Sequence, residues 1–158
     1  MENDYIRLVK DYLRDVEYCR VAASNLHDSI KELEENLHDV STKIASYEQN
    51  PGGNSELNAV EMESSRRIEQ EQQLNDAVKN YQRLQNHLAR VDRSLQCLTD
   101  EEQKALMYYY AERKSYLEIA DRQNMSERSC RRMVREATRK MALMMFGLKS
   151  KENIIFVH

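Results

Sequence analysis

Apolar residues recur at alternating steps of four and three along the first third of the chain. The series consists of Tyr5, Val9, Tyr12, Val16, Cys19, Ala23, Leu26, Ile30, Leu33, Leu37, Val40, Ile44 and Tyr47. This heptad spacing gives a helix a single apolar stripe and is typical of coiled coils. It predicts a helix over about residues 3–49. A loop at residues 50–54 should end that helix, because it holds the chain's only proline, which cannot continue the hydrogen-bonded ladder.

A second apolar stripe follows the loop and predicts a helix over about residues 55–98. Its members are Leu57, Val60, Ile68, Leu74, Val78, Tyr81, Leu84, Leu88, Val91, Leu95 and Leu98. Two long helices with a short connection favour an antiparallel coiled-coil hairpin, residues 1–98. The second stripe is sparse over residues 61–73, whereas the first is continuous over residues 33–44. Because a lone hairpin would leave part of the first stripe in water, we expect a homo-oligomer formed through the coiled coil.

Helix-capping signals divide the next segment into three shorter helices, expected over residues 100–111, 116–123 and 127–146. The signals are the pairs Thr99 with Glu102 and Ser115 with Glu118, which have the spacing of a capping box, and the single cap Ser126. Asn124 tolerates the left-handed backbone of a tight helix end, and Gly147 is a natural stop. A short helix, a tight turn and a capped helix predict a helix-turn-helix.

The whole chain is therefore expected to be all-α, with a helix-turn-helix domain at residues 99–148 and a C-terminal tail at residues 149–158. The last helix should bury an apolar stripe made of Cys130, Met133, Val134, Ala137, Met141 and Met144. The candidate DNA-binding residues are Lys114, Ser115, Tyr116, Ser126, Arg128, Ser129, Arg131, Arg132, Arg135 and Arg139. A guanidinium can bond bidentately to guanine or phosphate, and polar residues at a helix start suit phosphate. The alternative is a solvated face whose arginines pair with Glu127 and Glu136.

Several short motifs of this segment occur in an informative order. They are Leu-Thr-Asp-Glu-Glu at residues 98–102, three tyrosines at 108–110, Ser-Tyr-Leu-Glu-Ile-Ala at 115–120, and Met-Ser at 125–126 before the arginine-rich helix. Together they resemble region 4 of sigma-70-type factors. The resemblance implies a helix-turn-helix that binds the promoter −35 element in the major groove. Asn124 stands where that family often has glycine, and the N-terminal part lacks the family's promoter-melting region. The combination is also similar to small phage-encoded regulators, including late-gene activators of the RinA and ArpU kind.

Charge supports a C-terminal anion-binding surface, because residues 99–151 hold 12 Lys and Arg against 8 Asp and Glu, whereas residues 1–98 hold 12 against 18. No apolar run reaches transmembrane length and the N-terminus lacks a basic signal region, so we expect a cytoplasmic protein without membrane association. Three cysteines, Cys19, Cys97 and Cys130, are expected to be small buried side chains in a reducing compartment. Since nucleotide-binding, nucleophile and metal-ligand motifs are missing, we expect no enzyme, no metal and no cofactor.

These features predict a sequence-specific transcription regulator that binds double-stranded DNA and whose subunits are joined by the coiled coil. RNA polymerase is a further candidate partner. One alternative is a protein-interaction module that docks on RNA polymerase or on a sigma factor without stable DNA binding. Another is a purely structural coiled-coil protein. Heptads alone do not separate an oligomerisation device from a docking arm.

Overall fold

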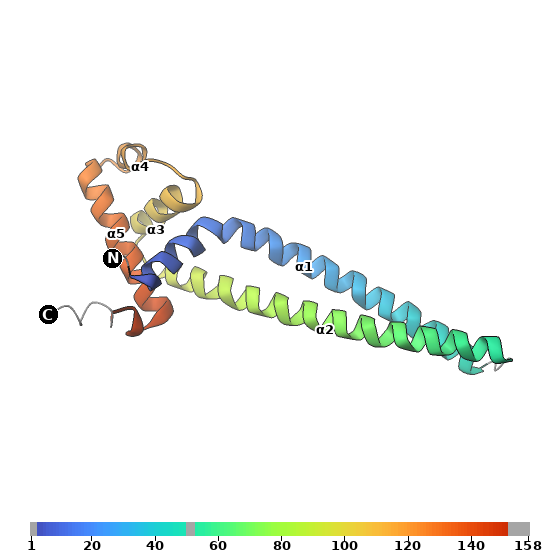
Figure 1. Ribbon diagram of the computed structural model, residues 1–158. Coiled ribbons are helices and arrows are strands. Elements are labelled where there is room, and N and C mark those ends of the chain that lie inside the picture. Colours follow the sequence, from blue (N-terminus) through green and yellow to red (C-terminus); the bar gives the residue numbers. More distant parts are fainter. Residues whose placement is uncertain (1–2, 50–52, 152–158) are drawn as a thin grey trace. The chain divides into compact units, whose positions relative to one another are not determined.

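The computed structural model describes residues 3–49 and 53–151, and every regular element within these ranges is helical. The elements are α1 (Asp4–Gln49), α2 (Asn54–Gln96), α3 (Asp100–Leu106), the π-helical turn η1 (Met107–Ala111), α4 (Tyr116–Arg122) and α5 (Glu127–Phe146) (Figure 1). The predicted all-α fold is confirmed. Residues 50–52 of the predicted loop, and the tail beyond Lys151, lie outside the described residues.

The chain packs as two compact units. The first, here called the terminal unit, contains residues 1–20 and 86–158, and the second, the hairpin unit, contains residues 21–85. The sequence predicts a domain boundary between residues 98 and 99, whereas the two units divide the chain after Arg20 and after Gln85. The reason is that the beginning of α1 and the end of α2 share a core with α3, α4 and α5, so the helix-turn-helix is not a separate body.

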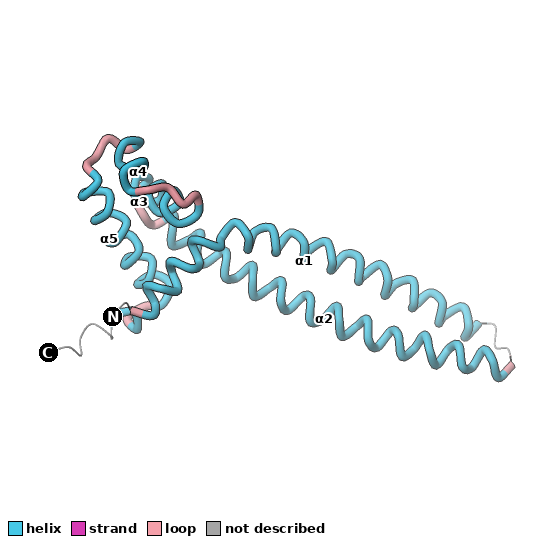
Figure 2. The backbone as a smooth tube through the Cα atoms, turned by 45° about the horizontal axis from the view of Figure 1, so that its top comes forward, coloured by secondary structure: helices cyan, strands magenta, loops and turns pink. Residues whose placement is uncertain are grey.

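In the hairpin unit, segments of α1 and α2 run antiparallel and pack against each other (Figure 2). Ala23, Val40 and Ile44 are buried, and the rings of His27 and Tyr81 lie 5.7 Å apart across the pair. All the α1 residues predicted from the heptad spacing are buried or half-buried along the whole helix. On α2 the predictions for Leu57 and Ile68 are wrong, because these side chains are 61% and 67% exposed. Both lie at the sparse start of the second stripe, where too few apolar neighbours continue the seam.

In the terminal unit, the first turns of α1 are more deeply buried than a two-helix seam requires. Val9 and Leu13 are fully buried, although Leu13 is not part of the heptad series. A third layer also packs against these turns, since Phe146 at the end of α5 places its ring 5.1 Å from Tyr5 and 6.2 Å from Tyr12. Tyr12 also makes an edge-on contact, 4.3 Å between centroids, with His87 of α2.

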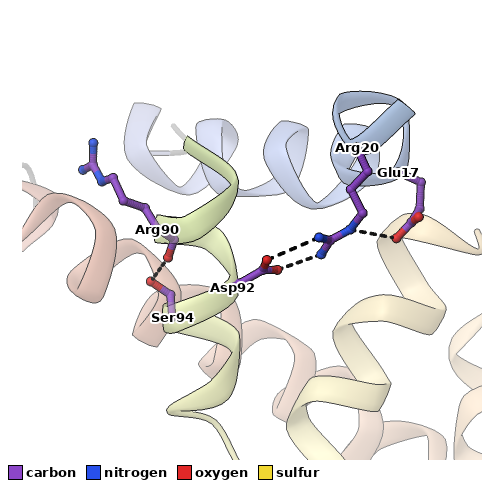
Figure 3. A network of polar contacts seen from close by, with 5 residues as sticks. All are labelled: Glu17, Arg20, Arg90, Asp92 and Ser94. Atoms are coloured by element: carbon purple, nitrogen blue, oxygen red, sulfur yellow. Dashed lines mark hydrogen bonds and ion pairs between the residues drawn. The ribbon is translucent and has the colours of Figure 1, made fainter. Parts of the chain in front are cut away.

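A forked ion pair joins α1 to α2 in this unit (Figure 3). The guanidinium of Arg20 donates to both carboxylate oxygens of Asp92, at 2.7 and 3.3 Å, and lies 3.5 Å from Glu17. The hydrogen bond to Asp92 is the main reason that the pKa of Arg20 is raised. Because the side chains are about two-fifths exposed, the pair fixes register more than it adds stability.

Side chains from distant parts of the sequence close the end of α5. Arg90 of α2 donates to the carbonyl of Met145 at 2.6 Å, which satisfies one of the last carbonyls of the helix. Asn3 donates to the carbonyl of Ser150 at 2.6 Å, and its own Oδ1 accepts from the amide of Tyr5 at 2.9 Å as a cap of α1. The two ends of the described chain are therefore tied together within one unit.

The three cysteines differ in their surroundings. Cys130 is buried and burial raises the pKa of its thiol, whereas Cys19 is half-buried and Cys97 is exposed. All three are free thiols. The prediction of a buried side chain is wrong for Cys97, because it follows the last residue of α2 and the helical period no longer sets its direction.

Candidate nucleic-acid interface

A capping box starts α4. The hydroxyl of Ser115 accepts the amide of Glu118 at 3.2 Å, and the Glu118 carboxylate accepts the backbone amide of Ser115 at 2.8 Å and its hydroxyl at 3.1 Å. These bonds lower the pKa of Glu118, the backbone bond being the largest cause. The predicted capping box is thus present, and it commits both the amide and the hydroxyl of Ser115 within the free chain.

A tight turn joins α4 to α5, as the loop segment between them in Figure 2 shows. Asn124 has φ +52°, the left-handed conformation that asparagine tolerates. The amide of Met125 donates to the carbonyl of Ala120 at 3.0 Å, which closes the end of α4. Ser126 then caps α5, since its hydroxyl accepts the amide of Ser129 at 3.1 Å. The sequence therefore predicted the helix-turn-helix at the level of its individual caps.

The core beneath these helices fixes their orientation. The buried side chains include Leu106 and Tyr110 from α3 and η1, Ile119 and Ala120 from α4, and Cys130, Val134, Ala137, Thr138 and Met141 from α5. Thr138 donates its hydroxyl to the carbonyl of Val134 at 2.7 Å, so the Tyr110 hydroxyl, 3.3 Å away, must donate to Thr138. Met144, predicted to be inward, is 38% exposed, and Met145 is buried in its place.

The start of α3 departs from the predicted capping box. Thr99 accepts the amide of Glu102 at 3.2 Å as expected. The carboxylate of Glu102 does not return to Thr99, and instead accepts Lys140 of α5 at 2.8 Å. This ion pair ties α3 to the middle of α5 on the side away from the arginine face.

The arginine face of α5 consists of Arg128, Arg131, Arg132, Arg135 and Arg139, and all five are exposed. Their spacing, i, i+3, i+4, i+7 and i+11, places them on one side of the helix over roughly 16 Å. Arg131 bonds to Glu127 at 3.0 Å, and Arg132 lies 3.7 Å from Glu136. Among the described residues the other three have no ion-pair partner. The alternative of internally paired arginines therefore accounts for two of the five.

A cluster of aromatic rings connects α4 to this face. The rings of Tyr109 and Tyr116 stack at 4.4 Å with 12° between their planes, and the guanidinium of Arg131 lies 4.9 Å from the Tyr116 centroid. Burial is the main reason that the pKa of Tyr116 is raised, so its hydroxyl remains protonated. The cluster holds Arg131 in place beside the start of α4.

The structure places the predicted residues in two groups, which meet where the Arg131 guanidinium lies over the Tyr116 ring. Lys114, Ser115 and Tyr116 lie at the start of α4, and Ser126, Arg128, Ser129 and the remaining arginines lie on α5. Sequence reasoning missed Lys10 and Arg14 of α1 and Arg113. They line a cavity of about 570 Å³ together with Lys114 and Tyr116. The only signal for the α1 residues was that Lys10 lies one position, and Arg14 two positions, from the heptad series.

The family comparison covers almost all of this architecture. Residues 1–143 match one family model, described as "Protein of unknown function (DUF722)". The chain belongs to the DUF722 family. Since the match runs from the start of α1 through most of α5, the long helices and the helix-turn-helix are one family unit. No curated protein and no solved structure matches the DUF722 chain.

Two further searches bear on the kind of site. Within residues 3–49 and 53–151 there is no group of three or more His, Cys, Asp or Glu side chains placed to hold a metal ion. None of the helices in the described part of the DUF722 chain combines the length and the apolar character needed to cross a membrane.

Proposed function

We propose that the DUF722 chain binds duplex DNA through α4 and α5 and acts as a sequence-specific transcription regulator, similar to region 4 of sigma-70-type factors. The observation that carries this proposal is the exposed arginine face on a helix that a tight turn and two capped starts hold rigidly on a buried core. A helix presented in this way fits the major groove, where arginine bonds to guanine.

The geometry suggests a division of roles between the two groups of residues. Arg128, Arg131 and Arg132 lie in the first two turns of α5, the part of a recognition helix that contacts base edges. Lys114 and Tyr116 lie at the start of α4, the helix that crosses the DNA backbone in such motifs. Arg135 and Arg139 are farther along the same face and are assigned to flanking phosphates.

A second copy of the chain is part of the proposal. Leu57, Met62 and Ile68 of α2 are 61%, 74% and 67% exposed, which supports an oligomer that covers them. Two recognition helices could then contact half-sites one helical turn of DNA, roughly 34 Å, apart or a multiple of that. Sedimentation analysis should give a dimer or a larger species, and a monomer at micromolar concentration would contradict this part.

Selection of bound duplexes from a random pool, followed by fluorescence anisotropy with the enriched sequence, tests DNA recognition. Arg128→Ala, Arg131→Ala and Arg132→Ala should each weaken binding by about 1–3 kcal/mol if they contact bases. The matched control is Arg83→Ala, an exposed arginine of the hairpin unit, which should bind as the unchanged protein does.

The salt dependence separates this proposal from docking on RNA polymerase or on a sigma factor. With about five charged contacts the log–log slope should be roughly −4 to −5, since each phosphate contact contributes about −0.9. An absence of enriched sequences from a folded protein would contradict DNA recognition and favour a protein partner bound with little dependence on salt.

A further inference from the structure

A cavity of about 570 Å³ lies beside the start of α4, within the terminal unit. Its lining is Lys10 and Arg14 from α1, Tyr109 and Tyr110 from η1, Arg113 and Lys114 from the following loop, and Tyr116 from α4. Four of these seven side chains are cationic and the other three are tyrosines. Lys10 and Arg14 of α1 belong neither to the predicted DNA-binding residues at the start of α4 nor to those on α5.

The charge of the lining favours an anionic ligand. Asp11 bonds to Arg14 at 3.0 Å and Glu112 lies 3.7 Å from Lys114, so each of these two cations has an acidic neighbour. Arg113 has no ion-pair partner among the described residues. Arg14, Arg113 and Lys114 thus carry three positive charges against the two negative charges of Asp11 and Glu112. The side chains of Arg14 and Lys114 are 45% and 24% exposed, which leaves them accessible.

The backbone around the cavity is committed, so the ligand would have to be held by side chains. The amide of Glu112 donates to Met107 at 3.0 Å, and that of Lys114 donates to Tyr108 at 2.9 Å. Arg113 between them has φ +54°, a left-handed conformation that turns the chain back toward α4. Three guanidinium or ammonium groups on two separate elements are the donor set that phosphate oxygens prefer.

We propose that this cavity binds a phosphate group, held by Arg14 of α1 together with Arg113 and Lys114. The phosphate comes either from the backbone of DNA lying across the start of α4 or from a free nucleotide, for which the cavity is large enough. The DNA source rests on the proposed function, whereas the nucleotide source does not. In the first case α1 takes part in the DNA interface.

Binding of three probes to the full chain tests this assignment: the selected duplex by anisotropy, and ATP and pyrophosphate by isothermal titration calorimetry. The variants are Arg14→Ala and Arg113→Ala. The control is Arg7→Ala. Arg7 lies on the same helix but outside the cavity, and it forms an ion pair with Asp4 that resembles the pair of Arg14 with Asp11. Circular dichroism establishes that each variant is folded, and Arg14→Lys should retain most of the binding because it keeps the charge.

Asp11→Asn provides a change of the opposite sign. It removes the carboxylate that bonds to Arg14, so it should tighten binding of the same probe that Arg14→Ala weakens. Raising the salt from about 50 to about 200 mM weakens duplex binding, and each phosphate contact contributes about 3.5-fold to this weakening, which follows from a slope of −0.9 per contact. A variant that has lost one phosphate contact should therefore weaken about 3.5-fold less over the same range.

The outcomes separate the two sources and the two proposals. Weaker duplex binding with a smaller salt slope in Arg14→Ala and Arg113→Ala supports a backbone phosphate. Binding of ATP or pyrophosphate that these variants lose supports a free nucleotide, even if the unchanged protein binds no duplex and the proposed function fails. If the variants bind every probe as Arg7→Ala does, or if the unchanged protein binds none of the three, the cavity is not a phosphate site.

Discussion

The capping box of α4 offers the sharpest link between sequence and stability. In the change Ser115→Ala, the hydroxyl that accepts the amide of Glu118 at 3.2 Å and donates to its carboxylate at 3.1 Å is removed. Helix α4 has only seven residues, and Ile119 and Ala120 within it are buried in the core. A defect at its first turn therefore disturbs core packing, and the cost should appear in global unfolding.

The magnitude follows from the value of a helix cap. Replacing a serine cap by alanine costs about 0.5–2 kcal/mol in the free energy of unfolding. With a urea m-value of about 2 kcal/mol per molar, a loss of about 1 kcal/mol lowers the midpoint by roughly 0.5 M. The m-value itself should not change, because the surface exposed on unfolding is the same.

The loss should also depend on pH. Because the pKa of Glu118 is lowered in the folded chain, its contribution is fully present above its unfolded pKa, roughly 4.3, and is lost as the pH falls through the lower folded value. The difference between the unchanged protein and Ser115→Ala should thus narrow on acidification. It should not vanish, since in the unchanged protein the Ser115 hydroxyl still accepts the backbone amide of Glu118 at low pH, and the variant lacks this bond at every pH.

Urea unfolding followed by circular dichroism at about pH 7 and about pH 3.5 measures both effects, and hydrogen exchange of the Ile119 amide reports on α4 directly. Ser126→Ala is the matched control, because Ser126 caps α5 without a carboxylate three residues later. Ser126→Ala should lower the free energy of unfolding by a similar amount at neutral pH. Its difference from the unchanged protein should narrow less in acid. Equal pH profiles for the two variants, or an unchanged midpoint for Ser115→Ala, would show that the reasoning is wrong.

Three further experiments test other parts of the structure. Gly147→Ala should lower the free energy of unfolding by about 1–3 kcal/mol, because Gly147 has φ +66° and ψ −153°, a region nearly restricted to glycine. No atom lies within 4 Å of an added Cβ, so the loss would come from the backbone, and an unchanged midpoint in thermal or urea unfolding would disprove backbone strain there. Ile119→Ala should cost about 2–5 kcal/mol, because the side chain is fully buried between the helices, and a loss below 1 kcal/mol would contradict the packing described. A thiol reagent followed by mass spectrometry should label exposed Cys97 well before buried Cys130, whose raised pKa also lowers its thiolate fraction, and equal rates would argue against these environments.

The local parts of this fold were predictable because they depend on neighbours in sequence. The heptad series of α1, the caps at Ser115 and Ser126, and the left-handed turn at Asn124 all rest on spacings of a few residues. Helical periodicity tells which side of a helix is apolar, and that is sufficient wherever one partner covers the side.

The parts that were not predicted depend on contacts between distant segments. Leu13 is fully buried in a unit that joins the start of α1 to segments far along the chain, which no period of α1 reveals. The carboxylate of Glu102 had two possible partners, the backbone amide of Thr99 and the ammonium of Lys140. The tertiary fold brings Lys140 to 2.8 Å, and the carboxylate bonds to it instead of to Thr99. The cavity beside α4 needs α1 and the loop after η1 together, so it could not be found before the helices were placed.

The shared core of the terminal unit has a consequence for the order in which the chain folds during synthesis. Residues 21–85 emerge as a contiguous stretch and can form their helical pair early. Tyr5 and Tyr12, in contrast, pack against Phe146, more than a hundred positions later. At about 5–20 residues per second, their partners leave the ribosome roughly 6–30 s after they do. During this interval the start of α1 exposes apolar surface, so the terminal unit is completed last and is the part most dependent on protection from aggregation.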